Sequence, residues 1–176
     1  MSWLLLTYRL PSGERSRERV AVWREVRRSG ALHLQQSVVA FPDTNHFRQA
    51  LERFRALVSE LGGQTLCLRG EPPTEADAER LAEAWDAARS AESDELTSEC
   101  EKFLAEIEHE FEIEKFTLAE LEEEEAELEK LRRWHERIAA RDVYGCARAA
   151  EAAAALERAG EALSRYTKAV FDRTQV

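Results

Sequence analysis

The sequence predicts an α+β protein in which a compact mixed domain, residues 1–71, precedes an antiparallel bundle of three long helices, residues 72–176. Short apolar runs that end at Pro or Gly alternate with helical patterns in the first part, whereas the second part shows helical spacing alone. The charge divides at the same place, since residues 1–70 carry eleven Lys or Arg against six Asp or Glu. The rest of the chain carries fourteen against twenty-nine. A basic mixed domain is therefore expected to precede an acidic helical one.

The elements of the first domain follow from its apolar runs and turn residues. Three runs suit strands, and the second of them is so long that a bend or hairpin is expected near Gln35 and Gln36. Two stretches with apolar residues three or four apart suit helices. The predicted order is a strand over 3–10, a helix over 15–29 with Val20, Trp23 and Val26 as its apolar residues, a strand or hairpin over 31–41, a helix from Asp43 or Thr44 to the stop at Gly62, and a strand over 65–68. This β-α-β-β-α-β order predicts a ferredoxin-like domain.

The second half is predicted to be helical throughout. One helical register starts at Thr74 and is open to interruption near Ser93, and a capping box of Thr117 and Glu120 marks the next helix. An alanine-rich helix then runs to about Phe171. Short connections predict antiparallel packing. The inward residues are expected to include Trp85, Leu96, Cys100, Phe103, Ile107, Phe111, Leu118, Leu121, Leu128, Leu131, Ile138, Leu163, Tyr166 and Val170.

Several functional classes are not expected from this chain. No segment reads as a signal peptide or a membrane span, so a cytoplasmic protein is expected. Cys67, Cys100 and Cys146 lie far apart and are odd in number, which indicates reduced, mostly buried thiols. No nucleophile elbow, phosphate-binding loop, dinucleotide fingerprint or zinc-protease motif is present, so no catalytic residue is assigned.

Arginines, without any lysine, gather near the start of the chain. The cluster consists of Arg9, Arg15, Arg17, Arg19, Arg24, Arg27 and Arg28. The rigid fork of donors on Arg suits phosphate and other oxyanions. Arg9 at a strand end, with Arg15 and Arg17 at the start of a helix, is expected to surround an anion. The alternative is a solvated surface on which these side chains pair with neighbouring glutamates.

Some carboxylates of the acidic half fall close to the apolar stripe. Glu124 or Glu125 continues the stripe of one helix, and Glu106 and Glu110 lie near the stripe of the helix before it. A solvated face with local salt bridges is favoured over inward carboxylates. No cofactor or metal is expected, because a carboxylate-bridged site needs matching pairs from other helices and only one Glu-x-x-His is present. The candidate ligands, were a metal to bind, are Glu106, His109, Glu110 and Glu124.

Segments along nearly the whole chain carry a family resemblance. They are WLLLTYRLP at 3–11, RVAVWR at 19–24, QSVVAFP at 36–42, FLAEIE at 103–108, TLAELEE at 117–123, LRRWHERI at 131–138 and RDVYG at 141–145. These segments resemble the N-terminal domain of ChrB, a family of chromate-resistance proteins. More distantly, Tyr8, the helix after it and residues 34–39 resemble the ferredoxin-like nucleases of CRISPR adaptation and the middle domain of PaaX-type repressors.

The resemblance implies a regulatory or accessory role in chromate resistance, since some ChrB proteins are chromate-responsive regulators of an efflux operon. Longer members add a C-terminal domain, which is not expected in this chain, so a homodimer or a separate sensing protein is an expected partner. DNA or chromate is the expected ligand of the arginines. The resembling nucleases have a metal-binding Asp where this chain has Arg9, so binding is expected and enzyme activity is not. The alternatives are a protein-interaction scaffold that uses the acidic helices and a vestigial nuclease.

Overall fold

The computed structural model describes residues 2–11 and 16–174. The described residues form a mixed α+β structure with four strands and five helices. These are β1 (Trp3–Arg9), α1 (Ser16–Ser29), β2 (Leu32–Gln35), β3 (Val38–Pro42), α2 (Asn45–Glu60), β4 (Gln64–Gly70), α3 (Glu75–Glu112), α4 (Leu118–Arg141) and α5 (Ala149–Thr174). The chain divides into two compact units, Met1–Trp85 and Asp86–Val176.

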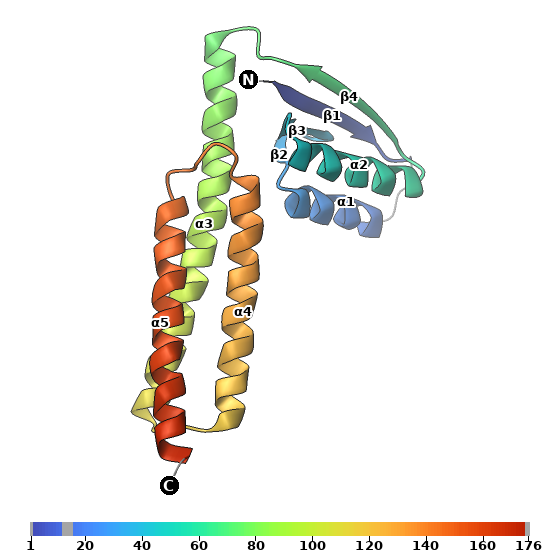
Figure 1. Cartoon of the computed structure of the whole chain (residues 1–176). Coiled ribbons are helices and arrows are strands. Elements are labelled where there is room, and N and C mark those ends of the chain that lie inside the picture. The colour runs from blue at the N-terminus through green and yellow to red at the C-terminus, as the bar shows by residue number, and fades with distance from the viewer. Residues whose placement is uncertain (1, 12–15, 175–176) are drawn as a thin grey trace. The chain divides into compact units, whose positions relative to one another are not determined.

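The first unit contains an antiparallel sheet with the strand order β2-β3-β1-β4. Its central strand, β1, pairs on both sides, so that Leu6 lies opposite Val39 on β3 and Cys67 on β4. Figure 1 shows α1 and α2 covering the same face of the sheet. The side chains between these layers are fully buried, as Leu6 and Phe54 illustrate. The end of β1 is thereby placed next to α1 and next to the turn between β2 and β3.

The predicted strands and helices of this unit are confirmed. The long apolar run after α1 is divided into β2 and β3, with Gln36 and Ser37 between them, as its length predicted. Thr44 is the N-cap of α2, and its hydroxyl oxygen accepts a hydrogen bond from the N–H of Phe47 at 3.4 Å. Strand β4 is longer than predicted because it pairs with β1 along its whole length, from Gln64 to Gly70.

The buried face of α1 includes only one of the three apolar residues that mark the predicted helix. Of Val20, Trp23 and Val26, only Val26 is buried, and Trp23 is 56% exposed. The face that packs on the sheet includes Val22, Glu25 and Val26. Spacings of three and of four both fit a helix, so a short apolar series leaves its rotation ambiguous. The structure places Val22 and Val26, four residues apart, toward the core and leaves Trp23 outside.

The first turns of α3 belong to the sheet unit. Trp85 on α3 packs edge-on against Trp3 of β1, with ring centroids 5.6 Å apart, and against Phe47 of α2 at 5.3 Å. Such edge-to-face pairs fix the relative orientation of the rings as well as burying apolar area. The compact unit around the sheet therefore continues past residue 71 into α3.

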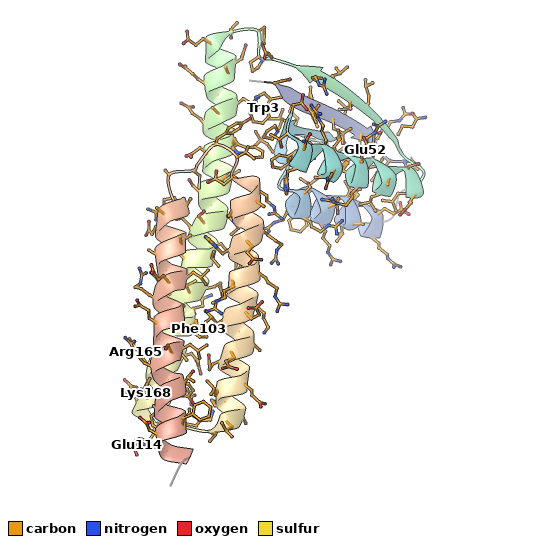
Figure 2. The ribbon with its side chains drawn as sticks, viewed as in Figure 1. Trp3, Glu52, Phe103, Glu114, Arg165 and Lys168 are labelled. Atoms are coloured by element: carbon orange, nitrogen blue, oxygen red, sulfur yellow. The ribbon has the colours of Figure 1, made fainter. Side chains whose placement is uncertain are left out.

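The second unit is a bundle made of the rest of α3 with α4 and α5, which alternate in direction (Figure 1). Its core draws on all three helices and includes Leu96, Phe103, Ile107, Leu121, Leu128, Ala152, Ala155, Ala159, Ala162 and Tyr166. The buried alanines repeat at helical spacing on α5 and allow the neighbouring helices to approach closely. Figure 2 labels Phe103, which is buried in this core, and Arg165 and Lys168, which are exposed on α5.

Three details of the bundle correct or complete the sequence analysis. Helix α3 continues through Ser93 without interruption. Leu118 and Phe111, predicted to face inward, are exposed, because Leu118 is the first residue of α4 and Phe111 lies near the end of α3. The Phe111 ring packs edge-on against Phe116 at 5.4 Å and against the buried Tyr166 at 5.7 Å. None of the described helices has a stretch long and apolar enough to cross a membrane.

Candidate functional site

A groove of about 390 Å³ opens at the end of β1, between α1 and the β2–β3 turn. We call it the arginine groove. Its lining consists of Tyr8, Arg9, Leu10, Arg19, Val22, Trp23, Val26, His33, Gln36 and Ser37. Two guanidinium groups, the rings of Tyr8 and Trp23, the imidazole of His33 and the polar side chains of Gln36 and Ser37 thus share one surface.

The end of β1 is fixed by its neighbour, β4. Gly63 precedes β4 and packs so closely that an added Cβ would lie 2.6 Å from the carbonyl oxygen of Arg9, a distance that real Cβ atoms do not show. Beyond it, Arg9 Nη2 donates a hydrogen bond to Gln64 Oε1 at 3.5 Å. This acceptor is a neutral amide, so the contact positions the guanidinium of Arg9 without neutralising its charge.

The turn between β2 and β3 supplies the polar side of the groove. Ser37 has a φ of 65°, in the left-handed region, which allows the tight turn. Its carbonyl oxygen accepts a hydrogen bond from the N–H of Tyr8 at 3.0 Å, and this bond ties the turn to β1. The Tyr8 ring packs edge-on against Phe54 of α2 at 5.3 Å. As a result, Gln36 and Ser37 lie beside the residues at the end of β1.

Helix α1 supplies the cationic and aromatic side. It carries five Arg and two Glu, a net charge of +3. Burial of Val22 and Val26 sets its rotation and places Arg19 and Trp23, four residues apart, in the groove. The guanidinium carbon of Arg27 lies 5.3 Å from the centre of the Trp23 ring, a cation–π arrangement.

The structure separates the predicted arginines into groups. Arg9 and Arg19 line the groove together, whereas Arg17 and Arg24 are exposed on α1 outside it. Arg17, predicted beside Arg9, is two residues from Arg19 and so lies about 200° around the helix from it. Arg28 pairs with the buried carboxylate of Glu25, with Nη2 and Oε2 2.5 Å apart. The predicted contribution of Arg15 lies outside the described residues.

Other arginines of the first unit pair with carboxylates. Arg48 and Arg69 flank Asp43, with nitrogen–oxygen distances of 2.7 and 2.9 Å. The hydrogen bond from Arg48 lowers the pKa of the Asp43 carboxyl group and raises the pKa of Arg48 itself. Arg55 pairs with Glu52 at 3.2 Å. Each of these arginines is paired with a negatively charged carboxylate. Arg9 in the arginine groove instead donates its hydrogen bond to Gln64, a neutral amide.

Two carboxylates of the second unit face the interior. Glu110 on α3 is 2% exposed and Glu124 on α4 is 6% exposed, so the expectation of a solvated face is wrong for both. Burial, and then the nearby charges of Glu106 and Glu110, raise the pKa of Glu124 to about 7. Glu110 Oε1 lies 3.6 Å from Lys115 Nζ, whereas Glu110 Oε2 is buried without a hydrogen-bond partner.

The candidate metal ligands do not gather around these carboxylates. Glu106 is exposed, and His109 is an exposed side chain whose Nδ1 lies 3.9 Å from Glu112 Oε2. Within residues 2–11 and 16–174, no three His, Cys, Asp or Glu side chains converge as a metal site would require. The raised pKa of Glu124 favours a bound proton on this buried carboxyl group.

A match to the protein family described as "Protein ChrB, N-terminal" covers residues 19–176. The chain belongs to this family. Its match begins at Arg19 and includes most of α1 and the β2–β3 turn, so every groove residue except those at the end of β1 falls within it. Membership of the ChrB N-terminal family connects the chain with chromate resistance. A search of curated proteins finds no match to this sequence.

Sequence reasoning missed the aromatic part of the groove. Trp23 was noted only as one of the apolar residues that mark the predicted helix, and Tyr8 and Ser37 had no assigned role at the site. One signal was available, because Arg19, Trp23 and Arg27 follow one another at intervals of four and so lie on one side of a helix. A Trp between two Arg on a helical stripe indicates an exposed binding face better than a core face.

Proposed function

We propose that this member of the ChrB N-terminal family is a cytoplasmic regulatory or accessory protein of chromate resistance that binds nucleic-acid phosphates in the arginine groove. The observation that carries the proposal is the convergence of Arg9 and Arg19, from β1 and α1, on one open surface. Each guanidinium fork can donate two parallel hydrogen bonds to phosphate oxygens. The net charge of +3 on α1 adds a sequence-independent attraction for a polyanion.

The proposal includes a ferredoxin-like assignment for the sheet and its two helices. Support comes from the β-α-β-β-α-β order of elements and from the strand order β2-β3-β1-β4 with both helices on one face. In this arrangement the end of β1, the start of α1 and the β2–β3 turn meet at the edge of the sheet that the strand ends form. That edge is where the arginine groove lies.

We propose binding and not strand cleavage. Arg9 directly follows Tyr8, at the position where the resembling nucleases have a metal-binding Asp. A guanidinium group repels a divalent cation and attracts a phosphate, so this residue favours holding the backbone over hydrolysing it. Loss of any cleavage activity is expected to accompany this exchange of charge.

Chromate itself is the second candidate ligand. A doubly charged tetrahedral oxyanion suits the donors of Arg9, Arg19 and His33, which line the same groove. Size favours nucleic acid, because a liquid water occupies about 30 Å³ and an anion of four oxygens is on the order of 100 Å³. The groove is about 390 Å³, within the range of pockets that hold small organic groups such as a nucleotide.

The test is binding of the full chain to DNA from the region upstream of its own gene. The double variant Arg9→Ala/Arg19→Ala is expected to bind about 10- to 100-fold more weakly at low salt, since two phosphate contacts are lost. Arg55→Ala is the matched control, because its side chain is exposed on α2 and already pairs with Glu52. Equal binding by the double variant and the wild type would contradict the assignment. Competition by millimolar chromate, and not by sulfate, would favour the second candidate.

A further inference from the structure

Trp23 is a large aromatic side chain that the fold does not use for its core. It is 56% exposed, while its neighbours Val22 and Val26 are buried and hold α1 on the sheet. An exposed Trp withdraws little apolar area from water on folding, so its presence is not explained by stability. Tyr and Trp in this condition are enriched at binding surfaces, where they provide rigid contact area.

The surroundings of Trp23 are cationic. Arg19 and Arg27 lie four residues to either side of it on α1, and the guanidinium of Arg27 is 5.3 Å from its ring centre. At a rise of 1.5 Å per residue, the two arginines are about 12 Å apart along the helix with the ring between them. Arg9 and Arg19 complete this surface because they line the same groove as Trp23.

We propose that Trp23 is a stacking platform for a nucleobase, with the flanking arginines holding the phosphates on either side; this inference rests on the proposed function. Nucleic acid is the ligand that presents negative charges and flat aromatic rings in alternation. Aromatic rings set in a positively charged groove are the usual platform for unstacked bases. Since a base must leave its stack to reach the ring, the preferred nucleic acid is single-stranded or locally opened, and not a continuous duplex.

An acidic protein partner is the competing explanation of the same surface. It would satisfy the arginines, but carboxylate side chains offer no ring to cover Trp23. The volume of the groove, about 390 Å³, also exceeds what one carboxylate needs and suits a base with its sugar. The observations therefore favour nucleic acid, and the acidic partner becomes an outcome of the test.

The experiment measures binding of the full chain to a single-stranded DNA of about twelve nucleotides, to its duplex, and to an abasic strand of the same length. Trp23→Leu is expected to weaken binding to the intact strand by roughly 5- to 100-fold, because a base–aromatic contact contributes that much. Its binding to the abasic strand is expected to equal that of the wild type. Trp23→Phe, which keeps a ring, is expected to retain most of the affinity. Phe171→Leu on α5, another exposed aromatic, is the matched control.

The outcomes separate this inference from the function on which it rests. If Trp23→Leu binds the intact strand like the wild type while Arg9→Ala/Arg19→Ala does not, the stacking role is overturned and phosphate binding stands. If the wild type binds no strand at low salt, phosphate binding fails and stacking fails with it. Equal affinity for polyglutamate and for the intact strand would also overturn the inference. Quenching of Trp fluorescence on binding, lost in Trp23→Phe, supports it independently of any change in affinity.

Discussion

The two units of this chain differ in where they place charged side chains, since one has arginines at an open groove and the other has carboxylates in its interior. In the first unit, Arg9 and Arg19 line an open groove. In the second unit, Glu110 and Glu124 are buried, and the charge of Glu124 is opposed by burial and by other carboxylates. A charge at a surface groove attracts a partner, whereas a charge in a helical core costs stability unless it is neutralised. The first unit is therefore the place to look for binding and the second the place to look for pH dependence.

The largest expected effect is on the pH dependence of stability. The pKa of the Glu124 carboxyl group is about 7 in the folded chain, against an ordinary value of 4.5. Between these two pH values, the folded chain keeps a proton on Glu124 that the unfolded chain releases. The contribution of Glu124 to stability is therefore fully present below about pH 4.5 and is lost as pH rises through 7, by on the order of 3 kcal/mol. Urea unfolding of the full chain between pH 5 and 8.5 measures this decrease.

Glu124→Gln removes the titrating group and keeps the size of the side chain. We expect its unfolding free energy to stay nearly level across that pH window and to exceed the wild-type value at pH 8. Glu125→Gln is the matched control, since Glu125 is the adjacent exposed carboxylate. A wild-type profile that is preserved in Glu124→Gln would show that the buried carboxyl group is not the source of the decrease.

The contrast between two glycines tests how the groove is positioned. Gly63→Ala places a Cβ 2.6 Å from the carbonyl oxygen of Arg9, so the end of β1 must shift. A loss of about 1–3 kcal/mol in unfolding free energy is expected, as for other overpacked sites, together with weaker binding at the groove. Gly70→Ala, at the other end of β4, meets nothing within 4 Å and is expected to change neither property. Equal effects of the two substitutions would contradict this role of Gly63.

The smallest effects are expected at the helix caps, one in each unit. Thr44→Ala and Thr117→Ala each remove a hydroxyl oxygen that accepts a hydrogen bond from the first turn of a helix. The donor is the N–H of Phe47 at 3.4 Å for Thr44, and the N–H of Glu120 at 3.2 Å for Thr117. Each is expected to cost about 1 kcal/mol of unfolding free energy. Replacement by Ser, which keeps the hydroxyl, is expected to restore most of it. A cap variant that also alters DNA binding would show that the groove depends on more of the chain than its lining residues.

The elements could be predicted from the sequence because their signals are local. Turn residues mark where the strands begin and end. Thr44 and Thr117 mark the starts of two helices, and the structure shows both as N-caps. The exposure of Trp23 could not be settled in this way, because a short apolar series fits more than one rotation of α1. Glu124 was predicted to face solvent, because charged side chains normally lie at the surface. Its burial depends on which helices pack against it, and the sequence does not show that.

The arginine groove lay beyond sequence reasoning for another reason. Arg9 and Arg19 were both noted, but their convergence depends on the pairing of β1 with β4 and on the rotation of α1. Ser37 also lines the groove, although it lies in a turn 29 residues after Tyr8. Its carbonyl oxygen accepts the hydrogen bond from the N–H of Tyr8 that holds the turn there. Contacts of this range follow from the topology of the sheet and leave no periodic signal.

The most direct test of the central claim, that nucleic acid meets the first unit at its arginine groove, is the salt dependence of DNA binding by the full chain. On duplex DNA, each phosphate contact contributes about −0.9 to the slope of log affinity against log salt concentration. We predict that Arg9→Ala/Arg19→Ala makes this slope shallower by about 1.8, while Arg133→Ala/Arg165→Ala, a matched loss of two exposed arginines in the second unit, leaves it unchanged. An unchanged slope in the groove variant, or an equal change in both, would contradict the account.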